Sequence, residues 1–237
     1  MEKWSVTHKR MKVLASEQHV ARGAAAVARQ CDVMAALYDS NGAPPLRTFD
    51  ANFSGISQII VGQQLSTASA NAIWSRVKTG VAPFDAPTVL SQSDTVLAGY
   101  GLSSAKITTL KALADAVAAN TIDIEALSDL PEDDIIAQLT SLHGIGPWTA
   151  DIYLLFALRR ADAFAPGDLA LQLAAQRLFA LKERPTPHAL TALAEQWRPW
   201  RGIAARLLWA DYGRARACNA PKSAQKKPKL LNSKLRK

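Results

Sequence analysis

Apolar side chains recur at helical spacing along most of the chain, whereas the alternation typical of strands is scarce. Ile56 and Ile59, followed by Ile73 and Val77, form apolar stripes that predict one long helix over residues 53–78. The same spacing predicts further helices over residues 22–38, 88–98, 105–119, 131–141, 147–158, 168–181, 186–196 and 199–212. We therefore expect an all-α fold.

The most informative interruption of this pattern is the stretch Leu-His-Gly-Ile-Gly-Pro-Trp-Thr-Ala at residues 142–150. Gly144 and Gly146 flank one apolar residue in a tight turn, and Pro147 opens the next apolar run. Residues 131–158 therefore predict a helix, a tight hairpin and a second helix. Such a turn aims backbone N–H groups outward at a helix N-terminus, which suits a phosphate.

One aspartate stands at a fixed distance from this hairpin. Asp168 follows Pro166-Gly167, about twenty residues after the glycine turn. Its purely structural interpretation is an N-cap for the helix that begins there, and this role is compatible with a catalytic one. A backbone grip on DNA together with one placed carboxylate is what an enzyme needs to work on a flipped nucleotide.

The basic charge of the chain is concentrated at its C-terminal end. The formal net charge of the 237 residues is +8. Residues 221–237 hold seven basic and no acidic residues, which leaves 21 basic and 20 acidic residues in the body. We expect this tail to be disordered, either as a solubilising terminus or cloning remnant, or as a non-specific DNA tether. The body would bind DNA through local arrangement of groups.

Cysteine usage and hydropathy bound the compartment. Cys31 and Cys218 are the only cysteines, which suggests a reducing compartment and excludes a four-thiolate cluster. The N-terminus lacks the apolar core of a signal peptide, and no apolar run approaches the length of a membrane span. These features predict a soluble cytoplasmic protein that binds no membrane.

Several of these features together resemble one known superfamily. The glycine hairpin, Trp148-Thr149-Ala150 directly after it, Asp168, and the flanking segments 61–66 (Val-Gly-Gln-Gln-Leu-Ser) and 197–202 (Trp-Arg-Pro-Trp-Arg-Gly) resemble the helix-hairpin-helix (HhH-GPD) DNA glycosylases. Within that superfamily the chain is most similar to the 3-methyladenine DNA glycosylase II branch.

The resemblance covers residues 53–212 and implies one glycosylase unit over residues 1–220. One helical lobe would span about 54–165. The other would combine about 1–53 with 166–220, and a DNA-binding cleft would lie between the two lobes.

The resemblance also implies a reaction. The enzyme would hydrolyse the N-glycosidic bond of alkylated purines, of the N3-methyladenine type, in double-stranded DNA during base excision repair. Asp168 would be the catalytic carboxylate, which stabilises an oxocarbenium-like transition state. Trp148 stands where relatives that also cut the backbone carry a lysine, so we expect a monofunctional enzyme without lyase activity.

The same resemblance implies a base pocket and a wedge. Trp148, Trp209 and Tyr153 are candidates for the pocket that receives the everted base, with core packing as the alternative for the tryptophans. Ile152 stands where the branch can carry a tyrosine, and Tyr153 next to it points about 100° away around the helix. Gln64, with Gln63 beside it, matches the wedge that fills the gap in the duplex; the alternative is a solvated polar face.

Phosphate binding is implied for the N–H groups of Gly144, Gly146 and Thr149. No cofactor is expected to be required. A monovalent cation, Na⁺ or K⁺, would be bound by the backbone carbonyls of Thr140, Leu142 and Ile145.

We expect a monomeric enzyme that acts on alkylated double-stranded DNA. The sequence leaves two other functions open. One is a glycosylase for a different base lesion. The other is a non-catalytic hairpin protein that recognises DNA structure.

Overall fold

The computed structural model describes residues 13–219. All the secondary-structure elements named in that range are helices. The single β-type contact there is an isolated bridge between Val13 and Arg160. The all-α prediction is confirmed for this part of the chain. The basic tail expected to be disordered, at residues 221–237, lies outside the described residues.

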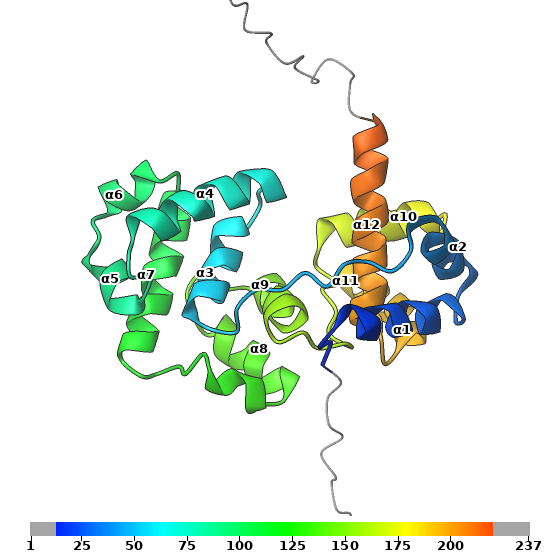
Figure 1. The fold of residues 1–237 in the computed structure, drawn as a ribbon, viewed down its shortest axis with the longest axis horizontal. Helices are drawn as coiled ribbons and strands as arrows, with labels where there is room; N and C mark the ends of the chain where they lie inside the picture. The colour runs from blue at the N-terminus through cyan, green and yellow to red at the C-terminus, as the bar shows by residue number, and fades with distance from the viewer. Residues whose placement is uncertain (1–12, 220–237) are drawn as a thin grey trace, which may run out of the picture.

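The helices form two groups (Figure 1). The group on the left contains α3 (Phe53–Gly62), α4 (Thr67–Gly80), α5 (Ala86–Ser91), α6 (Asp94–Gly99), α7 (Ser104–Ala118), η1 (Ala126–Asp129), α8 (Glu132–Thr140) and α9 (Pro147–Ile152). The group on the right contains α1 (Glu17–Ala28), α2 (Asp32–Asn41), α10 (Leu169–Leu178), α11 (Pro187–Ala194), η3 (Glu195–Trp197) and α12 (Arg201–Asn219). The cleft expected between the lobes stays a prediction.

Two predicted helices are each divided in the structure. The expected helix over residues 53–78 ends at Gly62 and restarts at Thr67, because Gln64 adopts a left-handed backbone (φ +55°) that an α-helix excludes. The expected helix over residues 22–38 divides between Ala28 and Asp32. Apolar periodicity continues across both breaks, so the pattern alone predicted single helices there.

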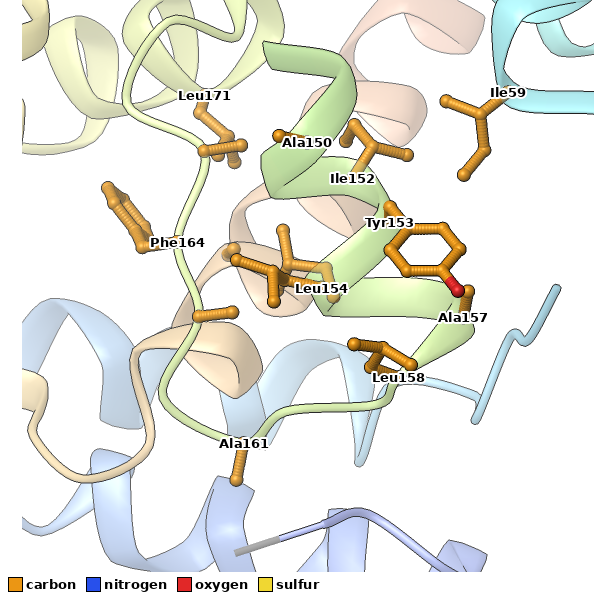
Figure 2. Packing of buried hydrophobic residues seen from close by; sticks show 14 of the residues in the cluster. Ile59, Ala150, Ile152, Tyr153, Leu154, Ala157, Leu158, Ala161, Phe164 and Leu171 are labelled. Carbon is orange, nitrogen blue, oxygen red and sulfur yellow. The ribbon is translucent and has the colours of Figure 1, made fainter. Parts of the chain in front are cut away.

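The buried side chains form two clusters. The smaller one lies within the left group and includes Trp74, Val77 and Leu110. The larger one joins both groups and is centred on a π-helical segment, η2 (Tyr153–Ala157), which continues α9. Figure 2 shows this segment with Tyr153, Leu154 and Leu158 pointing into the packed interior. The second hairpin helix is therefore anchored in the core shared by both groups.

The loop that leads from this segment to α10 is fixed by charged and backbone contacts. Arg201 at the start of α12 pairs with Asp162 (Nη2 to Oδ2, 3.1 Å) and with Glu195 (3.1 Å). The N–H of Gly202 donates to the Ala161 carbonyl at 2.9 Å, and a side chain at residue 202 would press on that same oxygen. These contacts hold the chain in place before Asp168.

No helix among residues 13–219 is both long and apolar enough to cross a bilayer.

One acid on the second hairpin helix, Asp151 in α9, is unfavourable in its charged form. Burial raises the pKa of the Asp151 carboxyl to about 7, the Glu132 carboxylate acts in the same direction, and Arg201 opposes them. A folded-state pKa above the unfolded value of about 4 means that the native state binds the extra proton. The stabilisation that this proton gives to the folded state is fully present below about pH 4 and is lost as the pH rises to about 7.

We predict that Asp151→Asn removes this loss. At pH 8 the variant should be more stable than the parent by about 1–3 kcal/mol, because no buried charge has to form, and at pH 4 the difference should shrink toward zero. Urea unfolding of both proteins at several pH values measures this. Asp39→Asn, at an exposed aspartate, is the control. A variant with the same pH slope as the parent would contradict the prediction.

Candidate active site

Asp168 begins α10 as its N-cap. Its Oδ1 accepts a hydrogen bond from the Leu171 N–H at 3.0 Å, and its backbone is extended (φ −74°, ψ 121°). The N-cap interpretation is confirmed. This role directs the side chain back over the helix N-terminus, where the helix dipole favours a negative charge.

Two indole groups also donate to this carboxylate. Trp148 Nε1, from α9, donates to Oδ2 at 2.8 Å, and Trp209 Nε1, from α12, donates to Oδ1 at 3.0 Å. With the Leu171 N–H, three donors from three helices converge on one half-buried carboxylate. Hydrogen bonds from N–H groups stabilise its negative charge and fix its orientation.

The structure brings the two tryptophans together at Asp168, through hydrogen bonds that the sequence did not predict, and their role in a base pocket stays a prediction. Both are partly buried and pack against the larger core cluster. Trp209 also lies against Phe156, with ring centroids 5.5 Å apart, and the Arg206 guanidinium lies 4.4 Å from the Phe156 centroid. Trp209 therefore packs against the core and also lies beside Asp168.

The prediction that Tyr153 belongs to the base pocket is wrong. Its side chain is fully buried, and its hydroxyl donates to the Ile124 carbonyl at 3.3 Å, inside the left group. Burial raises the pKa of the Tyr153 phenol, which keeps it protonated. Tyr153 therefore belongs to the core of the left group. Ile152 is buried as well.

The two hairpin glycines have different reasons to be glycine. Gly144 has a φ of +78°, and a Cβ there would overlap the Thr109 hydroxyl on α7. Gly146 has a φ of −97°, and a Cβ there would meet nothing within 4 Å. The fold requires the first glycine, whereas the second leaves open space in front of the hairpin.

The hairpin N–H groups are not equally available. Within the described part of the chain, the N–H groups of Gly144 and Gly146 make no backbone hydrogen bond. The N–H of Thr149 donates to the Gly146 carbonyl at 3.0 Å. Contrary to our expectation, it is therefore engaged within the helix start, and Gly144 and Gly146 are the better candidates for phosphate donors.

The glutamines predicted as wedge residues point in different directions. Gln64 is exposed in the turn between α3 and α4. Gln63 is folded onto the hairpin, and its Nε2 donates to the Gly144 carbonyl at 3.2 Å and to Thr149 Oγ1 at 3.0 Å. Of the two, only Gln64 faces solvent.

Comparison with known proteins assigns this arrangement to a family. The model for "HhH-GPD superfamily base excision DNA repair protein" matches residues 58–199, which include both the hairpin and Asp168. The chain belongs to the HhH-GPD superfamily. The resemblance inferred from the sequence is thereby confirmed.

Individual relatives of this superfamily protein are a quarter to a third identical to it over the aligned residues. It is 31% identical over 169 residues to DNA-3-methyladenine glycosylase 1 of Schizosaccharomyces pombe, covering 68% of this chain and 74% of the relative. It is 26% identical over 184 residues to a putative DNA-3-methyladenine glycosylase of Bacillus subtilis, covering 74% of this chain. The match spans only 64% of that Bacillus protein.

Solved structures agree with this fold. A Schizosaccharomyces pombe 3-methyladenine DNA glycosylase in complex with abasic DNA superimposes with a TM-score of 0.74 and 26% identity, covering 79% of this chain and 95% of that chain. A DNA-3-methyladenine glycosidase from Bacillus halodurans superimposes with a TM-score of 0.69 and 27% identity, covering 88% and 94%.

The hairpin geometry gives a paired prediction. Gly144→Ala should destabilise this HhH-GPD protein by roughly 2–4 kcal/mol, because the alanine meets both a left-handed backbone and the Thr109 side chain. Gly146→Ala should change stability by less than about 0.5 kcal/mol. Urea unfolding of the two variants tests this directly, and equal losses would mean that the two glycines are equivalent in the fold.

Proposed function

We propose that this protein is a monofunctional DNA glycosylase that removes alkylated purines, of the N3-methyladenine type, from double-stranded DNA. The observation that carries the proposal is the single carboxylate of Asp168, held by three N–H donors in a chain whose family acts in base excision repair. The relatives named as 3-methyladenine glycosylases support the choice of lesion.

The chemistry needs little more than this carboxylate. Cleavage of an N-glycosidic bond builds positive charge on the sugar, and an ionised Asp168 stabilises that charge and orients water toward the anomeric carbon. The bonding electrons leave with the base, which is cationic before cleavage and neutral afterwards. The attacking water loses one proton to solvent and becomes the hydroxyl group of the abasic site.

The indoles have two tasks in this proposal. Their N–H groups orient the carboxylate. Their ring faces would stack on an electron-poor, cationic base. Trp148 has no amine that could form a Schiff base with the sugar, so we expect no lyase step.

The hairpin delivers the DNA strand. The N–H groups of Gly144 and Gly146 bind a backbone phosphate, which can approach closely because Gly146 has open space in front of it. Gln64 fills the gap that the everted nucleotide leaves. One chain supplies every group named, which suits a monomer.

A monovalent cation fits the hairpin in this proposal. Of the carbonyls of Thr140, Leu142 and Ile145, only that of Leu142 accepts a backbone hydrogen bond from the described residues, so neutral oxygens remain for Na⁺ or K⁺. When bound, the cation would add positive charge beside the phosphate.

The proposal predicts that Asp168→Asn abolishes excision but not binding. Asparagine retains the N-cap, so the fold should persist, whereas the loss of negative charge should slow base release roughly 100-fold or more. Incubation with methylated duplex DNA followed by hot alkali reveals excised positions as strand breaks. Affinity for a duplex with a tetrahydrofuran abasic analogue should fall less than about threefold, and full excision by the variant would end the assignment.

A panel of lesion-bearing duplexes distinguishes the alternatives with the unmodified protein. Release of N3-methyladenine, with breaks appearing only after alkali, supports the proposal. Excision of an oxidised or deaminated base in its place would indicate another lesion class, and binding without release of any base would indicate a DNA-structure-binding protein.

A second prediction concerns the indole N–H groups. Trp148→Phe and Trp209→Phe keep an aromatic ring and remove the donor, so kcat should fall about 5- to 30-fold with little change in KM. Trp74→Phe, in the smaller core cluster and remote in sequence from the site, is the matched control. If both variants keep kcat and raise KM, the tryptophans contribute through stacking alone.

A further inference from the structure

The turn between α3 and α4 places two adjacent glutamines in opposite environments. Gln64 is exposed at its left-handed position, and the exposed apolar side chain of Leu65 follows it. Gln63 lies half-buried against the hairpin. The turn thus presents one glutamine outward and uses the other internally.

The amide of Gln63 is fully used as a donor. A side-chain amide carries two N–H bonds, and those of Gln63 point to the Gly144 carbonyl (3.2 Å) and to Thr149 Oγ1 (3.0 Å). These acceptors lie on either side of the turn that enters α9. One side chain therefore links the end of α3 to Gly144 in the hairpin turn and to Thr149 in the first turn of α9, more than 80 residues later in the chain.

A lysine fixes the same end of α3 from another side. Lys106 Nζ, on α7, donates to the Val61 carbonyl at 2.7 Å. Burial lowers the pKa of Lys106. An ammonium group at a helix C-terminus complements the helix dipole. Since α7 also contacts Gly144 through Thr109, the end of α3, the hairpin and α7 brace one another.

We propose that Gln63 is a positioning residue that fixes Gln64 relative to the phosphate-binding hairpin. The hairpin, which binds the strand, and Gln64, which fills the gap, then move as one rigid unit. The proposal rests on the DNA-binding roles given above for the hairpin and for Gln64. A wedge has to enter the duplex at one depth relative to the bound phosphate, and a misplacement of about 1 Å is costly at such sites. A direct clamp between the two elements supplies this constraint.

The test uses Gln63→Leu, which keeps the approximate size and removes both donors. Two duplexes are compared: one with a tetrahydrofuran abasic analogue and one undamaged. Affinity for the abasic duplex should fall about five- to tenfold, and affinity for the undamaged duplex should stay within about twofold. Fluorescence of a 2-aminopurine opposite the analogue reports the wedge and should shift toward its value in free DNA.

Thr149→Val removes one of the two acceptors without a change of shape and should give a smaller loss of the same kind. Gln196→Leu, at an exposed glutamine in the other helix group, is the matched control and should change neither affinity. Thermal unfolding identifies any variant that fails to fold; if Gln63→Leu fails, Thr149→Val carries the test.

A double-mutant cycle with Gln64→Ala distinguishes positioning from direct contact. If Gln63 acts through Gln64, adding Gln63→Leu to Gln64→Ala costs little more, whereas independent DNA contacts give losses that multiply. Multiplying losses, equal losses on both duplexes, or no loss at all would overturn the proposal. None of these measurements involves base release, so a protein that excises no alkylated base would refute the proposed activity without deciding this inference.

Discussion

The convergence of three N–H donors on the Asp168 carboxylate is the contact on which the candidate site depends. The donors come from α9, α10 and α12, so this one side chain ties the second hairpin helix to the helices of the other group. A negative charge taken partly out of water is costly unless it is hydrogen-bonded, and three donors meet that cost. The hydrogen bonds that offset the desolvation of this carboxylate also fix the orientation of its side chain.

The rest of the fold maintains that convergence. The π-helical segment after α9 is embedded in the cluster shared by both helix groups (Figure 2). It thereby anchors α9, the helix that carries Trp148. Arg201 and Gly202 hold the loop that leads to Asp168. Trp209 is supported through Phe156 and the buried Arg206, whose pKa burial lowers to about 10, so that it stays charged near neutral pH. Packing and electrostatics thus both maintain the arrangement of Asp168 and the two tryptophans.

The elements to which the proposal assigns DNA binding are also connected to one another. The hairpin packs on α7 at Gly144, and the turn that carries Gln64 is attached to the hairpin by Gln63 and to α7 by Lys106. In the proposed function such rigid contact elements favour binding, because their conformational entropy is lost during folding and not during binding.

The sequence by itself determined the helical class, the hairpin at residues 142–150, the position of Asp168 as an N-cap and the superfamily, because these follow from local periodicity, turn chemistry and motif spacing. The tertiary structure alone decided that Tyr153 is a core residue, that the indoles donate to Asp168, and that Gln63 and Gln64 face different ways. Each of these depends on where a side chain points relative to elements distant in the chain. At Gln64, one left-handed residue changes the direction of the chain, and this leaves the pattern of apolar and polar positions unchanged.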